Sequence, residues 1–172
     1  IDAVKKFIGQ QDLHAEHRYV TDVVQPSLQG PWPQKIAIIG GGPAGLSCAF
    51  FLATQGYKPT VFEKNERPGG MLRYGIPSFK LEKDVIDAEI DVLRELGVDI
   101  RCGVDVGRDV TLAQLREQGY KAFYIAIGCQ GGRKAGIPGE DAEGVMTAVD
   151  FLRIVGADES YPVTGKAVVV GG

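Results

Sequence analysis

Apolar residues along the chain follow two alternating patterns, short continuous runs and longer stretches with helical spacing. Short apolar runs bounded by turn residues predict strands. The runs at KIAII and YKAFYIAIG are apolar enough to predict strands of the buried kind. The expected strands are KIAII (35–39), KPTVFE (58–63), VDIRC (98–102), YKAFYIAIG (120–128) and, as the last strand, KAVVV (166–170).

Before and between these runs, apolar side chains recur at spacings of three and four, which predicts amphipathic helices. Gly56 and Gly97 stand where two of the helices should end, and Thr111 with Gln114 has the pattern of a capping box. Helices that alternate with strands favour a parallel sheet covered by helices. The expected helices span residues 2–10, 43–55, 82–96, 111–119 and 148–155.

The pattern predicts an α/β fold, a Rossmann-like domain with a parallel central sheet flanked by helices and an N-terminal helical extension. Residues 1–34 are the extension, which ends in a Pro-rich extended connector at 25–34. Residues 35–165 form the Rossmann-like domain, with a Gly- and Pro-rich loop without regular structure at 64–80. Residues 166–172 resemble 35–41 and predict the first strand of a second, truncated nucleotide-binding domain.

Composition narrows the function classes. The net charge is −3 and the basic residues are dispersed, so nucleic acid is not an expected partner. No stretch approaches about 18 uninterrupted apolar residues, so no membrane span is expected. Cys48, Cys102 and Cys129 form no CxxC pair, and His14 and His17 have no further ligand, so we expect no metal site. The free cysteines and the absence of a signal peptide indicate a cytoplasmic protein.

A glycine motif identifies the candidate site. Gly40, Gly42 and Gly45 fit G-x-G-x-x-G directly after a predicted strand, at the start of a predicted helix. The first glycine permits the tight turn, the second lets the backbone approach a pyrophosphate, and the third allows close packing of helix on strand. Pro43 and Ala44 then open the helix, whose N-terminus favours phosphate.

Glu63 ends the next strand, about 20 residues after the motif. Its carboxylate can accept hydrogen bonds from both hydroxyls of an adenosine ribose. A ribose 2′-phosphate would place a second anion beside it, so the site should reject NADP. The motif leaves FAD and NAD open.

A family resemblance favours FAD. The segments IGGGPAGL, FEKNERPGGMLRYGIP, ELGVDIRCGVDVGRDVT, GYKAFYIAIG and GIPGEDAEGV resemble the FAD domain of the glutamate synthase small (beta) subunit and of its relatives, among them the flavin region of dihydropyrimidine dehydrogenase. The resemblance extends over nearly the whole chain. It implies that Val106 meets the adenine through its backbone, and that Lys80 stands where relatives often have arginine near the cofactor. It further implies contacts to the ribose from Glu63 and Lys64, to the pyrophosphate and ring from Arg67, Gly70, Met71 and Leu72, and to the cofactor again from Ala126 and Gly128.

The resemblance also implies a function for the parent protein. NAD(P)H delivers a hydride to FAD, and the flavin passes electrons singly to iron–sulfur clusters outside this segment and to a partner subunit or domain, such as a glutamate synthase large subunit. The chain is then a fragment, with 166–172 opening the NAD(P)H-binding domain, and we expect no catalytic acid, base or nucleophile in it. Two alternatives stay open: an NAD-dependent dehydrogenase domain and a non-catalytic nucleotide-binding or assembly module.

Overall fold

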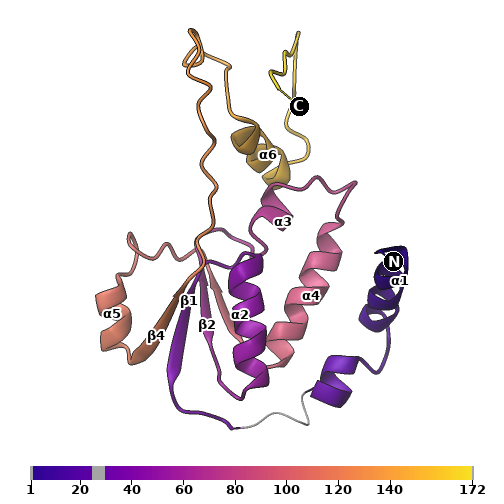
Figure 1. Ribbon diagram of the computed structural model, residues 1–172, viewed down its shortest axis with the longest axis vertical. Helices are drawn as coiled ribbons and strands as arrows, with labels where there is room; N and C mark the ends of the chain where they lie inside the picture. The colour runs from indigo at the N-terminus through magenta and orange to yellow at the C-terminus, as the bar shows by residue number, and fades with distance from the viewer. Residues whose placement is uncertain (1, 25–29, 172) are drawn as a thin grey trace.

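A parallel four-stranded sheet is the centre of the structure, a computed structural model that describes residues 2–24 and 30–171 (Figure 1). Strands β1 (Lys35–Ile39), β2 (Thr60–Glu63), β3 (Asp99–Cys102) and β4 (Tyr120–Ile125) lie in the order β3-β2-β1-β4. All three pairings are parallel, as the alternation of strands and helices predicted. The α/β, Rossmann-like fold is therefore confirmed.

Alternate residues of the central strands face two separate clusters. Ile38 and Val61 point to the face that α2 (Pro43–Thr54) and α4 (Lys83–Glu95) cover, through side chains such as Ala49 and Leu93. The opposite face carries a second cluster, in which α5 (Leu112–Glu117) contributes its one buried residue, Leu115. The second cluster contains Ala37, Ile39, Phe62, Leu115 and Tyr120. The sheet is therefore held between helices on both sides, and the helix boundaries agree with the sequence prediction to within a few residues.

The loop at 64–80 is more ordered than its composition suggested. It contains a short helix, α3 (Met71–Tyr74), so the expectation of no regular structure is wrong at this point. Helix α6 (Ala148–Ala157) packs on α3 after residues 126–147 leave the sheet as an extended arm (Figure 1). A side chain at Gly156 would have its Cβ 3.0 Å from the Cα of Tyr74, so the helices touch through backbone.

Strand β4 differs from the sequence prediction, which took it for a buried strand. It lies at the edge of the sheet, where β1 is its only partner among the described residues. Tyr124 and Ile125 are 44% and 55% exposed, and Ala122 is exposed as well. An apolar run indicates side chains that favour burial. At the edge of this sheet, β4 has a neighbouring strand on one side, and several of its side chains stay exposed.

The prediction of a last strand, KAVVV at 166–170, is wrong. These residues have no regular structure, and Val168, Val169 and Val170 are all more than 80% exposed. A strand requires a neighbour to pair its N–H and C=O groups, and in the described part of the chain none lies beside this segment. The assignment of 166–172 to a second domain stays a prediction.

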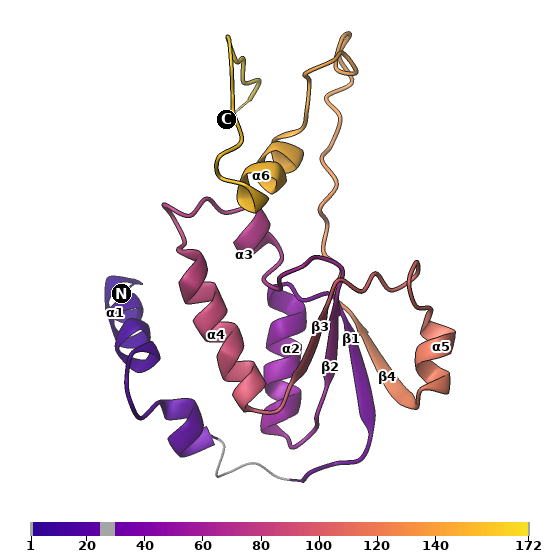
Figure 2. The same cartoon turned by 180° about the vertical axis from the view of Figure 1, so that it is seen from behind.

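The N-terminal extension lies outside the sheet and the helices that cover it (Figure 2). Helix α1 (Asp2–Leu13) buries no residue, whereas Val20 and Val24 of the following π-helix (Val20–Val24) pack against the cluster around Ile38. Arg18 pairs with Glu95, and the indole of Trp32 donates to the carbonyl of Gln55 at 2.8 Å. Part of the predicted connector, residues 25–29, lies outside the described residues. Among the described helices, none combines the length and apolar character needed to cross a membrane.

The capping box of α5 gives a first test. The Thr111 hydroxyl accepts from the Gln114 N–H at 3.2 Å, and the Gln114 side chain accepts from the Thr111 N–H at 2.8 Å. Thr111→Ala should lower the free energy of unfolding by about 1 kcal/mol, measured by urea denaturation. Thr111→Ser keeps the oxygen and is the matched control. Equal stability of the two variants would contradict the capping role.

Candidate cofactor-binding site

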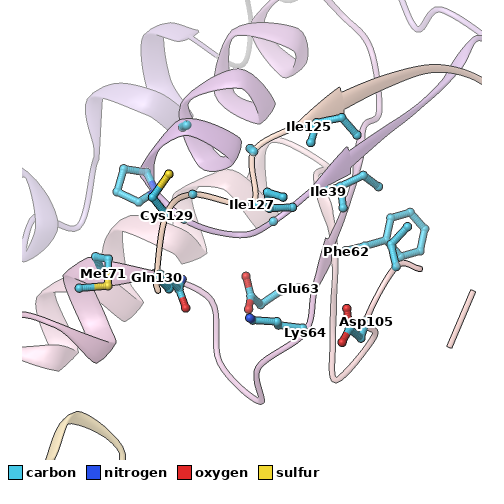
Figure 3. Close-up of a pocket in the computed structure, with 18 of the residues that line it drawn as sticks. Ile39, Phe62, Glu63, Lys64, Met71, Asp105, Ile125, Ile127, Cys129 and Gln130 are labelled. Carbon is cyan, nitrogen blue, oxygen red and sulfur yellow. The ribbon is translucent and has the colours of Figure 1, made fainter. Parts of the chain in front are cut away.

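A cavity of about 650 Å³ opens at the carboxyl ends of the central strands (Figure 3). Ile39 ends β1, Glu63 ends β2 and Ile125 ends β4, and all three line it. The chain runs from β1 outward to β3 and then returns to place β4 on the other side of β1. The cavity thus lies where the strand order reverses, which is where open α/β sheets bind ligands.

The glycine turn forms one wall of this cavity. Gly40 has φ +108°, and a Cβ there would overlap the carbonyl of Ala126, which directly follows β4. A Cβ at Gly45 would overlap the Gly40 carbonyl oxygen, so this glycine lets α2 approach β1 as predicted. At Gly42, by contrast, the nearest atom to an added Cβ is the Gly70 Cα at 3.7 Å. The room at Gly42 faces the cavity, and no side chain caps the N-terminus of α2 there.

Glu63 fastens the glycine turn to β2. Its side chain is buried, and Oε2 accepts the Gly41 N–H at 2.7 Å. Oε1 accepts both the backbone N–H and the side-chain amide of Asn65, at 2.8 and 2.7 Å. A carboxylate offers about four acceptor positions, so these three bonds leave about one, on Oε2, for a ligand hydroxyl. Contacts from both ribose hydroxyls stay a prediction that this geometry makes harder to satisfy.

The loop after β2 closes over the glycine turn. The Gly69 N–H donates to the Gly41 carbonyl at 2.7 Å, so both polar groups flanking Gly41 are bonded. Gly70 has φ +52°, and a Cβ on it would lie 2.7 Å from the Gly42 Cα. The backbones of Gly42 and Gly70 therefore meet at the cavity wall, in a contact that a side chain at Gly70 would prevent.

Most of the predicted contact residues line the cavity, and four do not. Gly45 lies behind the turn, and the Arg67 guanidinium is directed to Asp87 at 3.6 Å. Lys80 is exposed in the turn after α3. Leu72 is partly buried and does not line the cavity. Their cofactor contacts stay predictions. The predicted residues that line the cavity are Gly40, Gly42, Pro43, Ala44, Glu63, Lys64, Gly70, Met71, Val106, Ala126 and Gly128.

Sequence reasoning missed a further set of lining residues. Ile39, Phe62 and Ile125 precede the predicted contacts at strand ends, where the common carboxyl edge of a parallel sheet could have identified them. Asp105 and Cys129 carry polar atoms and are labelled in Figure 3, but the family resemblance assigned no cofactor contact to either residue. The full set of missed residues is Ile39, Phe62, Val104, Asp105, Ile125, Ile127, Cys129 and Gln130.

The cysteines of the described chain are free thiols. Burial raises the pKa of the Cys102 thiol, and the negative charge of Glu63 raises it further. Burial likewise raises the pKa of Cys48. A thiol is a poor nucleophile compared with a thiolate, so neither residue is suited to thiol–disulfide exchange at neutral pH.

The family is fixed by a match across most of the chain. A family model described as pyridine nucleotide-disulphide oxidoreductase matches residues 34–172. The chain belongs to this family. The glutamate synthase (NADPH) small chain of Halomonas elongata is 41% identical over 151 residues, which cover 84% of this chain and 32% of that protein. The NAD-dependent dihydropyrimidine dehydrogenase subunit PreT of Salmonella typhimurium is 40% identical over 169 residues, which cover 94% of this chain and 40% of that protein. The resemblance drawn from the sequence is thus confirmed.

A solved structure supports the same fold. FprA of Mycobacterium tuberculosis, in complex with NADPH, superimposes with a TM-score of 0.66 and 29% identity, covering 74% of this chain and 30% of that one. The chain spans between 27% and 40% of the length of the first curated relatives that it matches.

Gly42 and Gly45 make a matched pair for testing the turn. Gly42→Ala adds a methyl group that meets the Gly70 Cα at an ordinary contact distance of 3.7 Å, so the melting temperature should change little while binding of a dinucleotide falls sharply. Gly45→Ala drives a Cβ into the Gly40 carbonyl, so the fold itself should be destabilised. Thermal unfolding together with a binding titration separates the two effects. A Gly42→Ala protein that unfolds like Gly45→Ala would contradict this division of roles.

Proposed function

We propose that the cavity binds FAD, and that the chain is the FAD-binding segment of an NAD(P)H-dependent flavoprotein oxidoreductase. One observation supports this proposal most strongly: the turn at Gly42 and the loop at Gly70 meet at the cavity wall, beside the buried carboxylate of Glu63. Family membership and the similarity to a glutamate synthase small chain favour the same function.

The residues present fit such a cofactor. The volume is within the range of about 300–1,000 Å³ typical of cofactor sites. The uncapped N-terminus of α2 offers unpaired N–H groups and a partial positive charge to a pyrophosphate. Gly42 leaves the space that a phosphate needs, and Glu63 keeps about one acceptor position on Oε2 for a ribose hydroxyl.

Each wall then has a separate part in binding. The first turn of α2, with Pro43 and Ala44, would hold the phosphates, and Glu63 would orient the ribose and repel a 2′-phosphate. Val106, with apolar neighbours such as Phe62 and Val104, would receive the adenine. Met71 and Cys129 line the cavity beyond the phosphate turn and would meet the flavin half. When bound, FAD supplies hydride acceptance and single-electron transfer, while the chain supplies orientation and electrostatics.

The electron path beyond the flavin is a further part of the proposal. NADH or NADPH would be the donor, and iron–sulfur clusters outside this segment would carry electrons to a partner subunit or domain. The names of the relatives support a partner, because one is a small chain and another is a subunit. Their donors differ, one being named for NADPH and the other for NAD. The three free cysteines are consistent with a reducing, cytoplasmic location.

FAD binding and the role of Glu63 can be tested together by titration. Wild-type protein should quench flavin fluorescence saturably, and Glu63→Gln should weaken binding about ten-fold or more, since a hydrogen bond to a charged group contributes roughly 1.5–3 kcal/mol. Glu66 is an exposed carboxylate in the loop that follows β2, and Glu66→Gln is the matched control. Binding of NAD in place of FAD would favour the dehydrogenase alternative, and equal affinity of Glu63→Gln and wild type would contradict the ribose assignment.

A further inference from the structure

Arg73 is a buried cation that the proposed function does not use. It is 3% exposed, although it belongs to a four-residue helix in a surface loop. Its Nε donates to the Pro68 carbonyl at 2.8 Å, and its Nη2 forms an ion pair with Asp87 of α4. A buried charge is costly unless it is paired and hydrogen-bonded, and Arg73 satisfies that requirement with partners from two different elements.

These bonds extend directly to the cavity wall. Pro68 is followed by Gly69, whose N–H donates to the Gly41 carbonyl at 2.7 Å. The Gly41 N–H in turn donates to Glu63 Oε2 at 2.7 Å. A continuous series of polar contacts therefore runs from Asp87 on α4, through the loop and the glycine turn, to the carboxylate at the end of β2.

Other contacts fasten the loop on either side of this point. The Tyr74 hydroxyl accepts from the Arg67 N–H at 3.3 Å and donates to the Arg67 carbonyl at 3.2 Å. Lys83 donates to the carbonyls of Leu72 and Ile76. Gly69 and Gly70 lie between the Tyr74 and Lys83 contacts and have no side chains that could fix their position.

We infer that Arg73 is a positioning residue for the cofactor: it holds the Pro68–Gly70 backbone against the Gly41–Gly42 turn and so preforms the wall where the two loops meet. The guanidinium suits this role because its planar fork donates in two fixed directions at once. A lysine ammonium keeps the charge but cannot reproduce the paired Nε and Nη2 geometry. The inference rests on the proposed function for its effect on FAD, but not for its effect on the loop.

Arg73→Lys tests the inference with two readouts. Amide hydrogen exchange at Gly69 should accelerate about ten-fold or more, while the sheet amides of Ile38 and Val61 keep their protection. The dissociation constant for FAD should rise on the order of ten-fold, because binding must then also order the loop. Arg94→Lys on the exposed side of α4, where Arg94 pairs with Asp91, is the matched control and should change neither readout.

The outcomes separate the inference from the proposed function. If the wild type binds no FAD, the proposed function fails, and exchange at Gly69 still decides the role of Arg73. Unchanged exchange at Gly69 in folded Arg73→Lys, or an equal acceleration throughout the sheet, overturns the inference. If Arg73→Lys does not fold, Asp87→Asn removes the charge of the partly exposed partner. It should accelerate exchange selectively at Gly69, and wild-type protection there would overturn the inference.

Discussion

The peptide groups on either side of Gly41 connect the parts of the site. The N–H donates to Glu63 at the end of β2, and the carbonyl accepts from Gly69 in the following loop. Both bonds are 2.7 Å long, and the carboxylate is buried. The glycine turn, the Glu63 carboxylate and the second glycine loop are therefore held in one arrangement, in which Gly42 and the first residues of α2 line the cavity.

The two hydrogen bonds of Gly41 explain how a turn so rich in glycine can keep one conformation. Glycine costs more conformational entropy on folding than any other residue, so a glycine turn requires external support. Buried core residues supply part of this support, because Ile38 of β1 and Val61 of β2 pack in one cluster with residues of α2 and α4. Glu63 and Gly69 supply the rest of the support through their hydrogen bonds to Gly41. Binding energy can then be used on the ligand and not on ordering the turn.

Much of the fold could be predicted from the sequence, because strand runs and helix caps depend on residues that are neighbours in the sequence. The strand at 35–39 has the bounds predicted for it, and the capping box at Thr111 is present as predicted. Features set by tertiary neighbours could not be predicted. The apolar run at 120–125 is an edge strand because only β1 pairs with it, and 166–170 forms no strand because no neighbour pairs with it in the described part of the chain. Nothing in the sequence marks Asp87 as the partner of a buried cation, because only the fold places this helical carboxylate beside Arg73.

We propose that a preformed cavity at Gly42 and Gly70 receives the two phosphates of FAD while both hydrogen bonds of Gly41 stay intact. An amide-resolved NMR titration with FAD tests it most directly. The resonances of lining residues such as Gly42, Ala44, Gly70 and Val106 should move together and saturate, while the Gly41 amide keeps its protection from exchange. Shifts confined to the surface around α6, or loss of Gly41 protection on binding, would contradict it.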